Sequence, residues 1–211
     1  MNRTLIITGG EINEQFLVDE VKQDYETIIA VDKGLETAQK LNIKINHIIG
    51  DFDSVNTKIL ESYKNINIIK LNPEKDYTDT HMGVKLAIEQ GSKDITIVGW
   101  FGTRMDHVLG NINIMKEAME QNISCRLINK TNEIKLINKK TILKKDEKYK
   151  YVSLIPLTTE VSGITLEGFK YPLQEATLKI GESIGISNEI TAEKATIDIK
   201  NGILILIKSK D

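Results

Sequence analysis

Cysteine, an excess of charge of one sign, long apolar runs and familiar nucleotide-binding loops are all scarce or missing in this chain. Cys125 is the only cysteine, which excludes an internal disulfide and a cysteine-based zinc cluster and fits a reducing compartment. The formal net charge of −2 gives no electrostatic surface for nucleic acid. No apolar run approaches the roughly 20 residues of a membrane-spanning helix. We therefore expect a cytoplasmic protein that binds neither nucleic acid nor a membrane.

Missing motifs exclude two common classes of phosphate-transferring enzyme. The chain has no Gly-x-x-x-x-Gly-Lys-Ser/Thr segment, so it is not a P-loop enzyme. Protein-kinase signatures are missing as well. The pair Gly9-Gly10 lacks the third glycine of a dinucleotide fingerprint, and it fits a tight turn as well as a phosphate loop.

The first 129 residues alternate short apolar runs with segments of helical character. Continuous apolar runs are typical of parallel strands that helices cover on both faces. The strands are expected at residues 5–7, 27–31, 47–49, 66–71, 94–98 and 125–128, and the helices at 35–41, 55–63, 82–90 and 108–121. This alternation predicts a doubly wound, mainly parallel α/β sheet domain over residues 1–129.

From residue 130 the pattern changes to short alternating segments separated by turn residues. Strands are expected at 135–137, 151–155, 164–166, 176–178, 195–199 and 203–207. Short strands at regular spacing predict an all-β sandwich domain over residues 130–211. The pair Asn201-Gly202 predicts a type I′ hairpin turn between the last two strands, because that turn needs positive φ at both central positions.

Two aspartates follow the third predicted strand, in the segment 50–54 (GDFDS). On extended backbone, Asp51 and Asp53 would point to the same side. Like charges so close repel one another unless a cation or fixed donors neutralise them. Mg²⁺ is the expected cation, because it takes one or two protein carboxylates and fills its remaining positions with water and phosphate oxygens. The alternative is a solvated acidic turn in which Asp53 or Ser54 caps the next helix.

Charged and polar side chains also stand at the other strand exits, where ligands bind in open α/β sheets. Asp79, with Asp76 nearby, would join the aspartate pair at one edge of the sheet, while Arg104 and Lys75 supply positive charge there. Metal-bound polyphosphate would satisfy both sets. Several members have structural alternatives, because Asp32, Thr78, Asp79 and His107 all suit the start of a helix.

Three segments in this order and spacing resemble the thiamin pyrophosphokinase family: 50–54 (GDFDS), 76–79 (DYTD) and 102–107 (GTRMDH), the last with Asn111 one turn on. Segments 168–171 (GFKY) and 186–189 (ISNE) resemble the thiamin side of that family, so the likeness spans nearly the whole chain. This chain departs from the family in having Lys33 within 32–35 (DKGL), where Asp-Gly-Gly-Ala is commoner. Residues 100–104 (WFGTR) likewise differ from a frequent double-glycine run.

The resemblance implies a homodimer whose active site lies at the subunit interface. Residues 1–129 would bind ATP and Mg²⁺ and carry the catalysis, while residues 130–211 would bind thiamin and form the dimer. By motif, Asp51, Asp53 and Asp79 would coordinate Mg²⁺, with Arg104 and Asp106 beside the nucleotide and its phosphates. An aromatic residue suits thiamin because its thiazolium is a permanent cation. The remaining ligand-binding candidates are Asp32, Lys75, Asp76, Thr78, His107, Asn111, Tyr171, Ser187 and Asn188.

The implied reaction is attack by the hydroxyethyl oxygen of thiamin on the β-phosphorus of ATP, which gives thiamin diphosphate and AMP. Such a transfer asks the protein chiefly for positioning and charge neutralisation. Asp79 and Asp106 are alternative proton acceptors. The competing hypotheses are another Mg²⁺-dependent phosphotransferase or nucleotidyltransferase, a thiamin- or nucleotide-binding module without turnover, and a scaffold protein.

Overall fold

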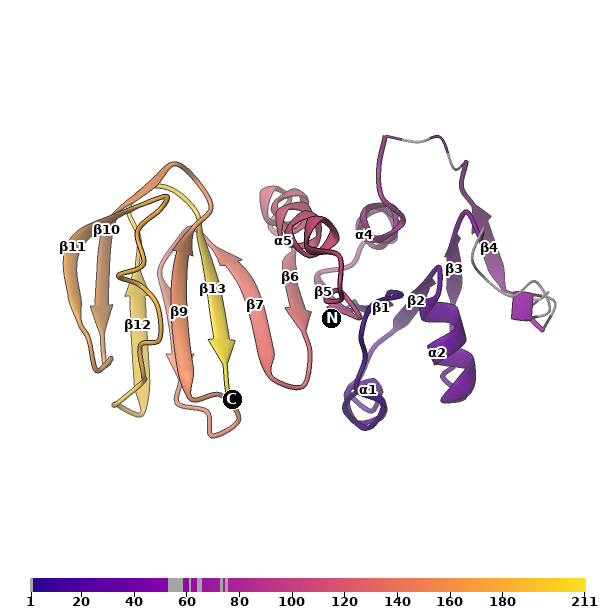
Figure 1. Ribbon diagram of the computed structural model, residues 1–211, viewed down its shortest axis with the longest axis horizontal. Coiled ribbons are helices and arrows are strands. Elements are labelled where there is room, and N and C mark those ends of the chain that lie inside the picture. Colours follow the sequence, from indigo (N-terminus) through magenta and orange to yellow (C-terminus); the bar gives the residue numbers. More distant parts are fainter. Residues whose placement is uncertain (1, 53–58, 61, 64–65, 73, 75) are drawn as a thin grey trace. The chain divides into compact units, whose positions relative to one another are not determined.

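A computed structural model describes residues 2–52, 59–60, 62–63, 66–72, 74 and 76–211 of the chain. The chain divides into two compact units, Met1–Lys130 and Thr131–Asp211 (Figure 1). None of the described helices is long and apolar enough to cross a membrane.

The first unit is built on parallel strands in the spatial order β4-β3-β2-β1-β5-β6. The strands are β1 (Arg3–Ile7), β2 (Thr27–Val31), β3 (His47–Gly50), β4 (Asn67–Lys70), β5 (Asp94–Val98) and β6 (Ser124–Ile128). The chain runs outward from β1 to β4, then returns to the other side of β1 with β5. The sheet therefore has a topological switch point between β1 and β5, which is where open α/β sheets bind ligands.

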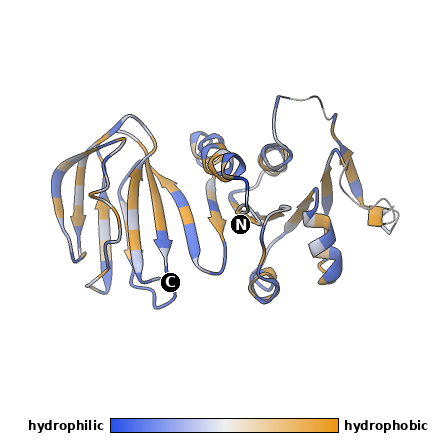
Figure 2. Cartoon of the chain, viewed as in Figure 1, coloured by the Kyte–Doolittle hydropathy of each residue, from blue (hydrophilic) through white to orange (hydrophobic). Residues whose placement is uncertain are grey.

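Helices cover both faces of this sheet, as the continuous apolar runs predict (Figure 1). On one face, α1 (Glu14–Val21) and α2 (Gly34–Lys40) bury Leu17 and Leu35 in a core with Leu5 and Ile7. On the other face, α4 (Asp79–Glu89) packs against the strands and against α5 (Met105–Glu120). In Figure 2 the central strands are mostly hydrophobic, whereas the helices carry both hydrophobic and hydrophilic residues. The predicted doubly wound α/β fold is confirmed.

Two elements of this unit differ from the expectation. The structure has an unpredicted helix, α1. Its N-cap is Asn13, whose side chain accepts a hydrogen bond from the backbone N–H of Phe16 at 3.0 Å. The predicted buried strand at 66–71 is the edge strand β4, and its side chains are mostly exposed. The helix predicted at 55–63 lies largely outside the described residues.

The second unit is an antiparallel sandwich, as predicted. One layer has the order β7-β13-β9 and the other β11-β10-β12-β8. Leu154 and Leu204 of the first layer share a core with Val161 and Ile197 of the second. The strands are β7 (Asn132–Ile137), β8 (Thr141–Lys144), β9 (Tyr151–Pro156), β10 (Glu160–Glu167), β11 (Leu173–Lys179), β12 (Lys194–Asp198) and β13 (Leu204–Ser209).

The expected hairpin at Asn201-Gly202 is wrong. Strands β12 and β13 lie in different layers, so the chain crosses the sandwich between them. Only Gly202 has a positive φ, of 94°, whereas a type I′ turn needs two such residues. Asn201 instead forms a backbone bridge with Ser162.

Candidate functional site

The loops that leave β1 and β5 are joined to each other by backbone hydrogen bonds. The N–H of Gly10 donates to the carbonyl oxygen of Gly99 at 2.9 Å, and the N–H of Glu11 donates to that of Phe101 at 2.7 Å. A Cβ at Gly10 would overlap both of these carbonyl oxygens. The loops therefore approach as closely as they do because residue 10 is glycine.

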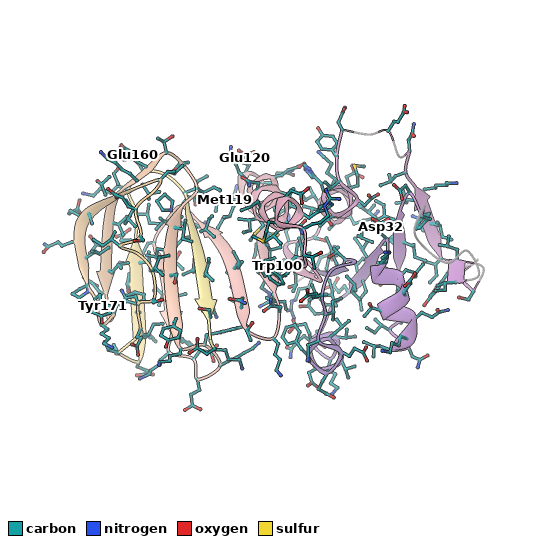
Figure 3. The ribbon with its side chains drawn as sticks, in the orientation of Figure 1. Asp32, Trp100, Met119, Glu120, Glu160 and Tyr171 are labelled. Atoms are coloured by element: carbon teal, nitrogen blue, oxygen red, sulfur yellow. The ribbon has the colours of Figure 1, made fainter. Side chains whose placement is uncertain are left out.

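A cleft of ≈ 470 Å³ opens where these loops meet the end of β2. It lies at the switch point of the sheet, so its position agrees with the general rule for α/β ligand sites. Asp32 and Trp100, both labelled in Figure 3, come from opposite sides of the switch point. The lining residues are Thr8, Gly9, Gly10, Val31, Asp32, Lys33, Thr80, Gly99, Trp100, Phe101, Gly102, Thr103, Arg104, His107 and Asn111.

Trp100 is held in place from two directions. Its indole N–H donates to the carbonyl oxygen of Ile128 at 3.0 Å, and its own carbonyl oxygen accepts from Asn111 Nδ2 at 2.8 Å. Asn111 is buried in α5, so this amide fastens the loop after β5 to that helix. His107, one turn earlier, is exposed and lines the cleft.

Arg104 and Asp106 form a two-pronged ion pair at the start of α5. Arg104 Nε donates to Asp106 Oδ1 at 3.2 Å and Arg104 Nη2 to Oδ2 at 2.5 Å. These bonds lower the pKa of the Asp106 carboxyl to about 2 and raise the pKa of the guanidinium. Asp106 is therefore ionised at neutral pH. Arg104 lines the cleft, whereas Asp106 is not part of the described lining.

Asp32 directly follows β2 and has a left-handed backbone conformation, with φ 47°. Its carboxylate lies against Gly50, because a Cβ at that glycine would overlap Asp32 Oδ1. Asp32 is not the N-cap residue of α2, since that position is taken by Lys33, whose side chain makes no capping hydrogen bond. Asp32 thus lies between the cleft and the segment that begins with Asp51.

The segment after β3 does not continue as an extended strand. Phe52 has φ 60°, which turns the backbone directly after Asp51. The reasoning that Asp51 and Asp53 share a side because they alternate along extended backbone is therefore wrong in its premise. Asp51 itself is half-buried and follows Gly50 at the end of β3. Asp53 lies outside the described residues.

The segment 76–79 leads into α4. Thr78 is the N-cap, and its hydroxyl accepts a hydrogen bond from the backbone N–H of His81 at 3.2 Å. Asp79 is the first residue of the helix, where its charge complements the helix dipole. Asp76 is exposed, and Lys75 lies outside the described residues. Thr80 is the residue of this helix start that lines the cleft.

The three carboxylates predicted to bind metal cannot be assembled from the described residues alone, because Asp53 is not among them. In the described part of the chain, no three His, Cys, Asp or Glu side chains group closely enough to hold an ion. The donor set still has the right chemistry, since carboxylate oxygens are what Mg²⁺ prefers. The Mg²⁺ assignment stays a prediction.

Several residues of the cleft were not named as site residues from the sequence. Lys33, Phe101 and Thr103 are exposed at its lining, and Thr8 donates from its hydroxyl to the carbonyl oxygen of Val98 at 3.0 Å. The sequence did carry one signal for them, because Lys33 and Phe101 lie in the two segments where this chain differs from the commoner family motifs. Among the described residues Lys33 forms no ion pair, whereas Arg104 has Asp106.

In the second unit, Asn188 supports the backbone of Tyr171. Asn188 Oδ1 accepts from the Tyr171 N–H at 3.0 Å, and Asn188 Nδ2 donates to the Tyr171 carbonyl oxygen at 2.7 Å. Tyr171 is 59% exposed (Figure 3). The Lys170 ammonium lies 5.6 Å from the centroid of the Tyr171 ring. Ser187, with φ 58°, donates its N–H to Ser153 Oγ. The predicted thiamin-side residues are thus close to one another.

Two family models match the chain, one for each unit. The model of the thiamin pyrophosphokinase catalytic domain matches residues 18–127, and the model of the thiamin pyrophosphokinase vitamin B1 binding domain matches residues 139–204. A thiamine pyrophosphokinase of Bacillus subtilis (strain 168) is 34% identical over 211 residues, which cover 98% of each chain. A thiamin pyrophosphokinase of Caenorhabditis elegans is 24% identical and covers 77% of this chain and 70% of its own.

Solved structures agree with these sequence matches. The crystal structure of thiamine pyrophosphokinase from Bacillus subtilis has a TM-score of 0.92 at 33% identity and covers 100% of both chains. Yeast thiamin pyrophosphokinase, at 17% identity, has a TM-score of 0.81 over 99% of this chain and 86% of its own, which supports the fold alone. Given family models over both units and a relative 34% identical along nearly its whole length, the chain belongs to the thiamin pyrophosphokinase family.

Proposed function

We propose that this chain is a thiamin pyrophosphokinase. The hydroxyethyl oxygen of thiamin attacks the β-phosphorus of ATP, and the bond from that phosphorus to the α,β-bridging oxygen breaks. The hydroxyl proton passes to a base, the β- and γ-phosphoryl groups leave together on thiamin, and AMP departs. The observation that carries this proposal is the match to both family domains along one chain.

The cleft at the switch point is the proposed nucleotide site. Its glycine-rich loops lie at strand exits, where glycine lets a phosphate chain approach the backbone closely. Lys33 and Arg104 add positive charge, and a guanidinium grips phosphate oxygens in a bidentate way. Because Arg104 starts paired with Asp106, that pair must open or share its donors when phosphate binds.

Mg²⁺ is the proposed cofactor, held by Asp51, Asp53 and Asp79. When bound, it would neutralise charge on the phosphate oxygens and orient them for in-line transfer. Asp51 and Asp79 stand at the end of β3 and the start of α4, both at the carboxyl edge of the parallel sheet. The proposal for Asp53 rests on the family motif.

Asp106 is a poor candidate for the proton acceptor. The Asp106 carboxylate already accepts two bonds from Arg104, and its pKa of about 2 makes it a weak base near neutral pH. We therefore assign Asp106 to holding Arg104, which leaves Asp79 as the proposed acceptor of the thiamin hydroxyl proton, through a carboxylate oxygen that does not hold Mg²⁺.

Thiamin is proposed to bind at the segment that holds Tyr171. The Tyr171 ring makes a cation–π contact with the Lys170 ammonium, and the thiazolium of thiamin would make the same kind of contact. Asn188 uses its side chain to fix the Tyr171 backbone, so its proposed role is support, with Ser187 beside it.

We further propose a homodimer with the active site at the subunit interface. The same segment of the β-domain exposes Ile184 and Ile186, and Ile180 before them is exposed as well, which suits burial against a second copy. Sedimentation of the wild type and of Ile184→Asp tests this, since a dimer that uses this surface should weaken in the variant. A cytoplasmic location is proposed because the only cysteine can form no internal disulfide.

The activity is tested by incubating purified protein with thiamin, ATP and Mg²⁺ and following the products by phosphorus NMR. We expect AMP and a diphosphate ester. ADP with a monophosphate ester would instead support an ordinary phosphotransferase, and an adenylylated product a nucleotidyltransferase. Unchanged ATP would contradict the proposal and favour a binding module.

A further inference from the structure

A cluster of four side chains, none of which lines the cleft, joins α4 and the segment before it to α5. Glu117 of α5 lies with its Oε2 2.6 Å from His81 Nε2 and accepts from Lys85 Nζ at Oε1, at 2.9 Å. The ring of Tyr77 meets the ring of His81 edge-on, with centroids 4.7 Å apart, and the Lys85 ammonium lies 4.8 Å from the Tyr77 centroid. We call these four residues the Glu117 clamp.

The charged members of the clamp are partly buried. The side chains of His81, Lys85 and Glu117 are each less than a third exposed. The hydrogen bond from Lys85 lowers the pKa of the Glu117 carboxyl, so this residue is charged at neutral pH. One carboxylate thereby holds the two side chains that pack against Tyr77.

Tyr77 connects the clamp to the proposed chemistry. It stands two residues before Asp79, and the intervening Thr78 is the N-cap of α4. The N–H that this cap accepts belongs to His81, which is itself a member of the clamp. The turn that presents Asp79 is therefore fastened at Tyr77 and at His81, on either side of the aspartate.

Helix α5 gives the clamp a fixed support. Asn111 bonds this helix to the loop after β5, and Arg104 and Asp106 stand at its start. Through the clamp, Glu117 thus holds the turn that carries Asp79 against α5, the helix at whose start Arg104 stands. A side chain that lines no part of the cleft can set the distance between two groups that act on one phosphate chain.

We propose that Glu117 is a positioning residue for diphosphate transfer, acting through Tyr77 and His81 on the turn that carries Asp79. This inference rests on the proposed function. It predicts a loss in kcat with little change in KM for ATP, because the cleft loops are held by contacts of their own.

The test is a double-mutant cycle with Glu117→Gln and Tyr77→Leu. Each single variant should lower kcat about tenfold and leave KM for ATP within about twofold. The double variant should lose about tenfold rather than about a hundredfold, because both changes release the same turn. Tyr77→Phe keeps the ring and should restore the rate that Tyr77→Leu loses. Multiplying losses in the double variant would overturn the proposal.

Glu120→Gln is the matched control. Glu120 lies on the same helix (Figure 3). It pairs with Lys116 in an exposed i,i+4 ion pair. Hydrogen exchange supplies a readout without turnover: the His81 amide should exchange faster in Glu117→Gln and at the wild-type rate in Glu120→Gln. Equal rates and equal exchange in the two variants would contradict the proposal. A wild-type protein that makes no AMP would instead contradict the proposed function.

Discussion

The cleft loops and the aspartate-bearing segments of the first unit are held in different ways. The loops after β1 and β5 are joined backbone to backbone, and Asn111 fixes one of them to a helix. Asp79 is instead held by side chains, through the Thr78 cap and the Glu117 clamp. Backbone contacts depend little on residue type apart from glycine, whereas side-chain contacts can be removed one at a time. The proposed nucleotide site and the proposed metal-binding edge should therefore respond differently to substitution.

Loss of the Asp79 carboxylate should have the largest effect. Asp79→Asn removes a proposed metal ligand and proton acceptor, so turnover should fall about a hundredfold or more. The fold should survive, as circular dichroism would report, because Thr78 still caps α4. Asp24→Asn, an exposed loop aspartate, is the control. A near-wild-type rate for Asp79→Asn would exclude Asp79 from the chemistry.

Gly10→Ala tests the cleft loops, which are held by backbone contacts. The added methyl would overlap the carbonyl oxygens of Gly99 and Phe101, and relieving that overlap should cost about 1–3 kcal/mol of stability. Gly110→Ala is a matched control, because a Cβ there meets nothing and alanine should stabilise α5 by about 0.5–1 kcal/mol. Denaturant unfolding measures both. Equal stability of the two variants would show that the loops do not need glycine at position 10.

Lys33→Ala should weaken the binding of ATP without changing the fold. Loss of one charge-assisted contact to phosphate is expected to raise KM for ATP about tenfold. Lys40→Ala, at the opposite end of α2, should leave KM unchanged. Calorimetry with ATP and with adenosine separates the contributions, since only ATP offers phosphate. Equal weakening of both ligands would place Lys33 at the base or sugar instead.

The Arg104–Asp106 pair predicts a small effect with a definite sign. The Asp106 pKa is lowered in the folded protein, so its contribution to stability is present above the usual aspartate pKa and is lost as pH falls toward about 2. Because the pair is exposed, its effect is small. The difference in Tm between wild type and Asp106→Asn should therefore narrow below about pH 4. A difference that grows on acidification would contradict the assigned pKa.

The general fold followed from the sequence because buried parallel strands leave continuous apolar runs. Runs such as residues 27–31 identify strands whatever surrounds them. Helix α1 was missed because it is short and buries only Leu17 completely. Asn201-Gly202 was misread because a turn signal does not say which sheet the next strand joins.

The sequence predicted which residues belong to the site better than it predicted how they are arranged in space. Charged residues at strand exits identified Asp32 and Arg104, both of which line the cleft. The left-handed turn at Phe52 had no signal, since phenylalanine rarely adopts positive φ. Much of the cleft is backbone from glycine-rich loops, which carries no side-chain signature. The Glu117 clamp depends on contacts between two helices, and the periodicity of a sequence does not predict which helices contact each other.

The most direct test of the proposed reaction is to ask which phosphorus–oxygen bond breaks. ATP labelled with heavy oxygen at the α,β-bridging position is incubated with thiamin, Mg²⁺ and the protein, and the products are weighed by mass spectrometry. Attack at the β-phosphorus leaves the label in AMP and none in thiamin diphosphate. Label in the thiamin product, or in ADP, would contradict diphosphate transfer.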